Sequence, residues 1–500
     1  MTAPRTKMLR QPWIPALFLS LFGFAVRLVG IGRESIWLDE ATSLFLARKS
    51  LPDLIAWTAK DIHPPLYYIL LHFWRAFGES EAALRSLSAV AGAASVGVLY
   101  LLARRLFDGR TGVIAAVLLT LAPMHVAYSQ QARMYTLLGL WVLLASYLLV
   151  FALEERKAGY WIAFTVVNVL SLYTHYYTVF GFLVQGLFAL YVSWRKHSWW
   201  NLLWTGVAMT LSVLLYTPWI PTMVVQVSSG GGSWVAQTGV PGLRAIADVL
   251  IGFIVGNVRA LYPAWMRWAA YILFAGLALW ALVRGARSAA HGDRREESGI
   301  IFALVYLAAP IATAWLISQV KPLYSGRYLL VFLPGLLLLA ARGLVILPPV
   351  GRDLISPYKV LRWGVAAVLV ILLVFGVAQT AANPQNDDWR GAAAYVSEGA
   401  KPGDVAVFYP GWNEKPFDYY VREPLPSVTA FKVPLPQGEV ESSVRPGLEG
   451  HSRAWLIWSI GHYGDPEGLV KAYLDRAHTF VEFRQFRGPI GVALYDLTFK

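Results

Sequence analysis

Long apolar runs are the feature of this sequence that most restricts its fold. Eleven stretches have roughly the 17 to 25 apolar residues that a helix needs to cross a hydrocarbon core about 30 Å thick. They lie at 12–30, 82–103, 111–127, 135–153, 160–177, 178–194, 201–219, 263–283, 299–319, 328–345 and 363–379. Apolar residues make up 57% of the 500 positions and charged residues only 15%, which excludes disordered and fibrous classes. We therefore expect a polytopic α-helical membrane protein.

Two further apolar segments, 64–77 and 243–256, are only about 14 residues long, which suits interfacial or re-entrant helices better than membrane spans. If both crossed the membrane, the number of spans would rise to thirteen. The first span has no small-residue cleavage site and is expected to be a retained helix rather than a signal peptide.

The distribution of charge predicts the orientation. The net charge is +13, but residues 1–379 carry 31 Lys and Arg against 15 Asp and Glu, whereas residues 380–500 carry 12 against 15. With a cytoplasmic N-terminus, the inner connections hold 17 Lys and Arg in 62 residues and the outer ones 10 in 113. The positive-inside rule favours this orientation in a plasma or inner membrane. We expect no nucleic-acid partner, because the basic excess follows the topology.

The sequence predicts two domains, a transmembrane module at 1–380 and an extracytoplasmic α/β domain at 383–500. Residues 387–396 and 466–480 have helical patterns, and four short apolar runs at 404–410, 453–460, 481–486 and 491–497 have strand patterns. The proline-rich run from Pro424 to Pro446 is expected to be a loop. The outer loop 220–262 contains SSGGGS and is a candidate lid. Cysteine is absent, which excludes disulfides and thiol chemistry.

Carboxylates are concentrated in the outer loop 31–81, which holds seven of the 15 that precede residue 380. Asp39 and Glu40 lie there in IWLDEATSLF, among apolar neighbours at the membrane edge. Partial desolvation raises the pKa of a carboxylate and makes it a useful general base. The alternative is that Asp39 only caps the following helix.

The same loop ends in DIHPPLYY. The two prolines fix the backbone and start a helix, so Asp61 and His63 are held rigidly just before it, with Tyr67 and Tyr68 at the interface. A carboxylate and an imidazole supply half of a divalent-metal site or a phosphate clamp. They could equally well only hydrogen-bond the loop.

Polar groups also lie at the outer ends of later spans, namely Arg133 with Tyr135, His175, and Arg327. Ionisable residues in such places usually face a cavity, and a guanidinium matches the charge of a phosphodiester. The alternatives are that the arginines snorkel to lipid headgroups and that His175 hydrogen-bonds a neighbour.

Five motifs in this order, WLDEA, HPPLYYILL, LRSLSAVAG, QARMYTLL and GRYLLVFLPGLLLLAARGL, resemble those of the C-type (GT-C) integral-membrane glycosyltransferases. The resemblance covers residues 12 to 380. The most similar branch is the bacterial group related to the protein O-mannosyltransferases and the lipid A aminoarabinose transferase. The tail resembles a small extracytoplasmic domain often appended in this group.

The resemblance implies inverting transfer of a sugar from a polyprenyl-phosphate donor to an acceptor protein, lipid or glycan. It implies Asp39 as the catalytic base, with Glu40 beside it. It also implies contacts to the donor phosphate from Arg133, Tyr135 and Arg327, joined by Tyr67 and Tyr68. Asp61, His63 and His175 are the counterparts of ligands to a divalent ion such as Mg²⁺, Mn²⁺ or Zn²⁺, although Asp-Ile-His before Pro64 departs from the family's pattern.

Two other functions account for the same spans. A transporter or flippase of lipid-linked sugars would also need charged groups inside a helical bundle, but transporters usually contain two related halves, and the sequence has no such repeat. An assembly subunit would use the tail to bind a partner. The resemblance favours the glycosyltransferase.

Overall fold

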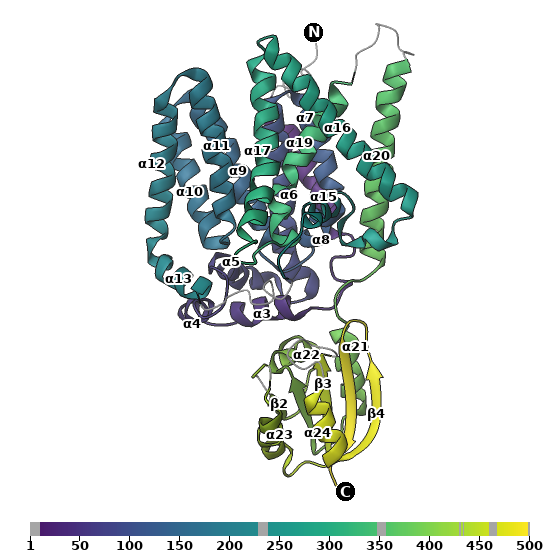
Figure 1. The fold of residues 1–500 in the computed structure, drawn as a ribbon. Coiled ribbons are helices and arrows are strands. Elements are labelled where there is room, and N and C mark those ends of the chain that lie inside the picture. Colours follow the sequence, from purple (N-terminus) through teal and green to yellow (C-terminus); the bar gives the residue numbers. More distant parts are fainter. Residues whose placement is uncertain are drawn as a thin grey trace, which may run out of the picture. The chain divides into compact units, whose positions relative to one another are not determined.

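The computed structural model describes residues 11–228, 239–347, 357–429, 432–433, 435–459 and 468–498. The SSGGGS part of the expected lid lies mostly outside these residues. The chain forms two compact units (Figure 1). The helical unit comprises Met1–Ile31, Ser50–Gly78 and Ala82–Asn383, and the sheet unit comprises Gly32–Lys49, Glu79–Glu81 and Pro384–Lys500.

All eleven expected spans are helical. Within the described residues, eight helical runs are long and apolar enough to cross a membrane. These runs are α6 (Glu81–Leu106), α9 (Tyr135–Glu155), α11 (Thr178–Lys196), Trp199–Ser228, α16 (Ala264–Ala290), α17 (Arg294–Ile317), Gly326–Val345 and α20 (Pro357–Ala382). A bent pair, α7 (Gly109–Thr120) and α8 (Pro123–Ser129), meets at 61° and would be a ninth. The other two, α2 (Trp13–Leu28) and α10 (Ala158–Thr174), are shorter apolar helices. The expected multi-pass helical fold is confirmed.

Two of these runs are built from three pieces. Trp199–Ser228 consists of α12 (Trp199–Tyr216), η2 (Thr217–Trp219) and α13 (Ile220–Ser228). Gly326–Val345 consists of α18 (Gly326–Leu329), η4 (Leu330–Phe332) and α19 (Leu333–Val345). The remaining helices of this unit are α4 (Leu51–Thr58), α5 (Leu66–Trp74), η1 (Arg75–Phe77), α15 (Arg244–Val255) and η3 (Gly256–Leu261). α5 and α15 cover the two short apolar segments, and neither is long enough to span.

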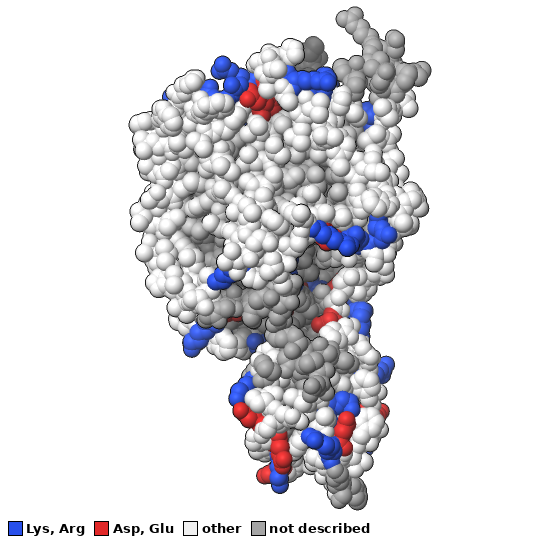
Figure 2. Space-filling view, viewed as in Figure 1, with Lys and Arg blue, Asp and Glu red and all other residues white. Residues whose placement is uncertain are grey.

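Burial separates a central helix from lipid-facing ones. The run that ends in α19 is 89% buried across its apolar window, whereas the windows of α20 and of the run that begins with α12 are each 22% buried. In Figure 1, α19 lies among α7, α16 and α17. The helical unit carries a broad uncharged belt between two levels at which Lys and Arg gather (Figure 2). Such a surface suits a helical bundle in a bilayer.

Glycines on α19 allow the central helix to pack closely. A Cβ atom added to Gly343 would lie 2.1 Å from the carbonyl oxygen of Leu277 on α16. One added to Gly335 would lie 2.7 Å from the backbone nitrogen of Leu307 on α17. Small residues at helix interfaces let backbones approach each other in this way. The position of α19 therefore depends on these two residues.

We expect Gly343→Ala to destabilise the helical unit by about 1–3 kcal/mol, the usual cost of overpacking a tight interface. Thermal unfolding of the purified protein in detergent would measure this as a lower midpoint. Gly276→Ala on α16 is the matched control, because a Cβ atom there meets nothing within 4 Å. Equal midpoints for the two variants would contradict the close packing.

The sheet unit contains a mixed five-stranded sheet of order β2-β1-β3-β5-β4. Its strands are β1 (Asp404–Tyr409), β2 (Ser427–Thr429), β3 (Arg453–Ser459), β4 (Thr479–Gln485) and β5 (Ile490–Asp496). β1 pairs in parallel with β2 and β3, and β5 pairs antiparallel with β3 and β4. Its helices are α3 (Leu38–Ala47), α21 (Trp389–Gly399), η5 (Gly411–Asn413), α22 (Glu414–Asp418), η6 (Gln437–Glu439), α23 (Val440–Leu448) and α24 (Leu469–Ala477).

Alternate residues of β1 point to opposite faces of the sheet, and both sides of this strand are covered, whereas the edge strand β4 is exposed. Val405 and Val407 pack in one core with α23 and α24. Ala406 and Phe408 pack in a second core with α21 and with Phe417 of α22. The expected small α/β domain is confirmed.

The expectation of a loop from Pro424 to Pro446 is wrong in part. β2 extends the sheet at one edge, and α23 begins at Val440 and contains Pro446 near its end. Val440, Val444 and Leu448 are buried at helical spacing. Burial of this apolar stripe on the sheet outweighs the proline signal on which the expectation relied.

Candidate functional site

Two histidines from separate motifs meet in the helical unit. His63, between α4 and α5, and His175, just after α10, are 4% and 3% exposed, and their ring centroids are 4.9 Å apart. The Nδ1 of His175 accepts a hydrogen bond of 3.1 Å from the backbone N–H of Tyr177. That bond fixes the orientation of the His175 ring and leaves Nε2 as its remaining polar atom.

Three tyrosines surround this histidine pair. The Tyr328 ring lies 4.8 Å from both His175 and Tyr177. The Tyr135 ring lies 5.8 Å from Tyr328 and 6.5 Å from His175. The motifs around residues 63, 135, 175 and 328 therefore converge on one aromatic cluster, which we call the His–Tyr cluster.

Several polar atoms of the His–Tyr cluster are buried without a hydrogen-bond partner. They are both ring nitrogens of His63, the Nε2 of His175 and the hydroxyl of Tyr135. A buried polar group left unsatisfied costs about 1–3 kcal/mol, so a group of this kind calls for an explanation. A polar ligand that bonded these atoms would offset the cost.

The imidazole of His63 is held in its neutral form. Burial lowers its pKa well below the usual value, and the neighbouring His175 and the positive charges of Arg133 and Arg327 lower it further. Pro64 and Pro65 directly follow His63 and lead into α5, which restricts the backbone at this point. A neutral, oriented imidazole is the form that can ligate a metal or accept a hydrogen bond.

Arg133 connects the cluster to the tyrosines of α5. Its side chain is buried, its guanidinium lies 5.9 Å from the ring centre of Tyr135, and it donates a long hydrogen bond of 3.5 Å to the Tyr68 hydroxyl. Ser88 of α6 donates to the backbone carbonyl of Arg133 at 2.8 Å and meets the Tyr67 hydroxyl at 3.1 Å. Through Ser88, α6 therefore contacts both the motif that contains Arg133 and the motif that contains Tyr67.

Arg327 lies on α18, which is a single turn, and is half-buried. It is close enough to His63 for its charge to act on that imidazole. Seven of the predicted site residues thus belong to the His–Tyr cluster or its immediate surroundings: Tyr67, Tyr68, His63, Arg133, Tyr135, His175 and Arg327. Tyr177 and Tyr328 were not among the predicted site residues, and the signal for the first was the run of tyrosines around His175.

Asp61 lies within electrostatic range of the Tyr176 hydroxyl. In the described part of the chain, no three His, Asp or Glu side chains come together as a group that could hold a metal ion. The imidazole atoms of the His–Tyr cluster that are open to a cation are the two ring nitrogens of His63 and the Nε2 of His175.

Asp39 and Glu40 belong to the sheet unit, in the first turn of α3. The N-cap of α3 is Trp37, so Asp39 does not occupy the capping position of the alternative interpretation. Asp39 is half-buried and Glu40 is fully buried. Two carboxylates at a helix N-terminus are favoured by the helix dipole.

A hydrogen-bonded clamp fixes the segment before α3. The hydroxyl of Tyr420 accepts from the backbone N–H of Ile36 at 2.7 Å and donates to Glu81 at 3.0 Å. Arg390 pairs with the same Glu81 at 2.6 Å and also donates to the backbone carbonyl of Arg33 at 3.3 Å. We call Tyr420, Glu81 and Arg390 the tail clamp. Through it, residues from the end of the chain hold the segment that leads into α3.

About a third of the chain matches a known family model. Residues 62–221 match the family model described as dolichyl-phosphate-mannose-protein mannosyltransferase. That range contains the histidines and Arg133 of the His–Tyr cluster. No curated protein sequence matches the chain. The family match and the solved structures below confirm the resemblance to the C-type membrane glycosyltransferases.

Solved structures share the fold over nearly the whole chain. ArnT from Cupriavidus metallidurans in the apo state is 13% identical, with a TM-score of 0.59 over 95% of this chain and 97% of that one. ArnT bound to undecaprenyl phosphate has a TM-score of 0.58 at 12% identity, with the same coverage. Archaeal oligosaccharyltransferase AglB from Archaeoglobus fulgidus, in complex with an inhibitory peptide and a dolichol-phosphate, is 14% identical, with a TM-score of 0.56 over 96% and 73%.

We expect Tyr420→Phe to loosen the segment before α3, because it leaves the Ile36 amide without its acceptor at a cost of about 1–3 kcal/mol. Hydrogen–deuterium exchange of peptides covering residues 32–49 should become faster. Tyr473→Phe on α24 is the control in the same unit. Unchanged exchange in the Tyr420 variant would mean that the tail clamp does not hold this segment.

Proposed function

We propose that this protein is an inverting glycosyltransferase that moves a sugar from a polyprenyl-phosphate-linked donor to an acceptor on the extracytoplasmic face. The strongest support is the His–Tyr cluster, with buried unsatisfied polar atoms beside Arg133 and Arg327. Its fold is shared with ArnT, which has been solved with undecaprenyl phosphate bound. The acceptor is a protein, a lipid or a glycan.

In this proposal the donor's lipid tail stays in the bilayer and its phosphate lies beside the cluster. Arg133 and Arg327 bind the phosphate, and the hydroxyls of Tyr135, Tyr67 and Tyr68 orient it. Charge-assisted hydrogen bonds from a guanidinium are well suited to this group. They become stronger as negative charge develops on the leaving phosphate, which is the condition for accelerating the chemical step.

Asp39 acts as the general base, and Glu40 supports it. The carboxylate of Asp39 takes the proton from the acceptor hydroxyl or amine while that oxygen or nitrogen attacks the anomeric carbon. The bond from this carbon to the phosphate oxygen breaks, and polyprenyl phosphate leaves on the opposite side. A single displacement of this kind inverts the anomeric centre.

A divalent cation is part of the proposal, and Mg²⁺, Mn²⁺ and Zn²⁺ are the candidates. His63 and His175 would hold it through their unsatisfied imidazole nitrogens, a donor set that favours Zn²⁺ over Mg²⁺. A bound cation would act as a Lewis acid on the leaving phosphate.

The proposed orientation places the N-terminus in the cytoplasm and the sheet unit outside the cell. It rests on the threefold excess of Lys and Arg density in the inner connections. The ends of α6, α9 and α11 that carry Arg105, Glu154 and Lys196 line one pocket, which is compatible with their connections sharing one face of the membrane.

We expect Asp39→Asn to lower sugar transfer by roughly 10²–10⁴-fold, the usual contribution of a general base. Transfer from a radiolabelled polyprenyl-phosphate sugar to the membrane acceptor fraction would measure this. Asp53→Asn is the matched control, because Asp53 lies in the same loop and bonds only locally, to Ser50 at 2.6 Å. Full transfer by the Asp39 variant, with normal membrane insertion, would rule out the assignment of the base.

We expect EDTA to abolish transfer if a cation is held at the histidine pair, and Zn²⁺ or Mn²⁺ to restore it. His63→Ala should then bind less metal than the wild type in elemental analysis of the purified protein. His72→Ala on α5 is the control, because His72 lies outside the cluster. If EDTA leaves transfer unchanged and His63→Ala binds as much metal as the wild type, a cation at the histidine pair takes no part in the mechanism.

A further inference from the structure

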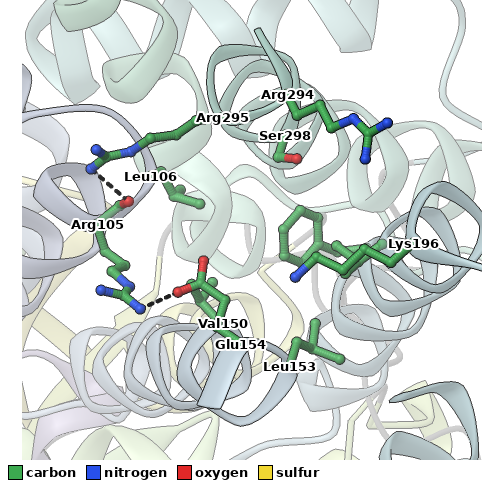
Figure 3. A pocket seen from close by; sticks show the side chains of 11 residues that line it. Arg105, Leu106, Val150, Leu153, Glu154, Lys196, Arg294, Arg295 and Ser298 are labelled. Carbon is green, nitrogen blue, oxygen red and sulfur yellow. Dashed lines mark hydrogen bonds and ion pairs between the residues drawn. The ribbon is translucent and has the colours of Figure 1, made fainter. Parts of the chain in front are cut away.

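A pocket of about 410 Å³ opens between helix ends in the helical unit (Figure 3). Its walls come from the C-terminal turns of α6, α9 and α11 and from the first turn of α17. The function proposed above does not use it. These ends belong to connections that the charge pattern assigns to the cytoplasmic side.

The pocket is strongly basic. Arg105, Lys196, Arg294 and Arg295 line it, and Glu154 is the one carboxylate among the described lining residues. Four cations against one anion leave an excess of three positive charges. Arg105 is half-buried, whereas Lys196, Arg294 and Arg295 are exposed. Cations gathered around one pocket with apolar walls attract anions to it.

Contacts within the fold hold two of the cations, Arg105 and Arg295. Arg295 donates to the backbone carbonyls of Arg104 and Arg105, at 3.0 and 3.1 Å. Arg105 lies over the Phe151 ring at 4.6 Å and forms an ion pair with Glu154. In Figure 3 the amine of Lys196 extends toward the middle of the pocket. Less side-chain entropy is therefore lost when an anion binds.

The other walls of the pocket are hydrocarbon. Leu153, Phe188 and Val192, from α9 and α11, contribute apolar side chains beside the cations. A free inorganic anion would gain no binding energy from this apolar surface, whereas an anionic lipid presents a phosphate group and an acyl chain together. Basic pockets between transmembrane helices on the cytoplasmic side are suited to anionic lipid headgroups.

The pocket is separate from the His–Tyr cluster. Ser88, which contacts Arg133 and Tyr67, lies near the start of α6, and Arg105 lies near its end. At 1.5 Å per residue the two positions are about 26 Å apart along the helix axis. The geometry points to a second lipid site, which binds the phosphate-bearing headgroup of an anionic membrane lipid at the other end of α6.

The test uses the full-length protein in detergent and native mass spectrometry with an equimolar mixture of phosphatidylglycerol and phosphatidylcholine. The wild type is expected to retain phosphatidylglycerol preferentially. The double variant Lys196→Gln/Arg294→Gln should weaken that binding roughly tenfold or more, since each cation near a lipid surface contributes substantially to binding. The matched control, Arg284→Gln/Arg287→Gln, removes two cations from the neighbouring end of α16 and should bind like the wild type.

Both variants are first compared with the wild type in thermal unfolding without added lipid, so that a loss of binding is not a loss of fold. If the double variant unfolds early, Lys196→Gln alone replaces it. Equal retention of phosphatidylglycerol by pocket variant and control would overturn the proposal. So would equal retention of the two lipids by the wild type, or displacement of phosphatidylglycerol by millimolar inorganic phosphate, which would identify a site for a soluble anion.

Discussion

The arrangement of the helical unit depends on one buried guanidinium. Arg27, near the end of α2, is fully buried, and all its hydrogen-bond partners in the described part of the chain are neutral. It donates to the carbonyls of Gly23 and Leu119 at 2.8 and 3.3 Å and to the Ser129 hydroxyl at 3.0 Å, and it lies 2.8 Å from the Nδ1 of His125. A charge at such a depth is tolerated only when its donors are satisfied. Arg27 therefore fixes α2 against the bend between α7 and α8.

The position of the His–Tyr cluster depends on these contacts of Arg27. Gln130, at the end of α8, donates to the backbone carbonyls of Arg27 and Val29 at 2.9 and 2.7 Å, and Arg133 follows three residues later. A Cβ atom on Gly92 of α6 would lie 2.9 Å from the Nε of Arg27, so this glycine lets α6 pack against the same guanidinium. α6 then carries Ser88, which bonds Arg133. One desolvated cation thus sets the positions of several helices that surround the proposed donor site.

The sequence predicted local features well and long-range ones poorly. Apolar length located a helix at each of the eleven expected spans, and the Pro-Pro motif located the start of α5 just after His63, because both signals are contiguous in the chain. His63 and His175 could be named individually, but their 4.9 Å approach depends on how the helices pack, which no local pattern encodes. Nothing in the outer loop 31–81 indicates that its Glu81 pairs with Arg390, more than 300 residues away. The prediction of a loop in the proline-rich run was wrong in part for a similar reason. α23 is stabilised by burial of its apolar stripe on the sheet, and this contact is not local in the sequence.

The tail clamp makes the order of synthesis matter. α3 and its two carboxylates are translated near the beginning, but Arg390 and Tyr420, which hold the segment before α3, emerge more than 300 residues later. At about 5–20 residues per second, the ribosome needs roughly 20–70 s to translate the residues between α3 and Arg390. During this time the segment before α3 lacks the two side chains that hold it, so its final conformation depends on residues that are translated much later in the chain.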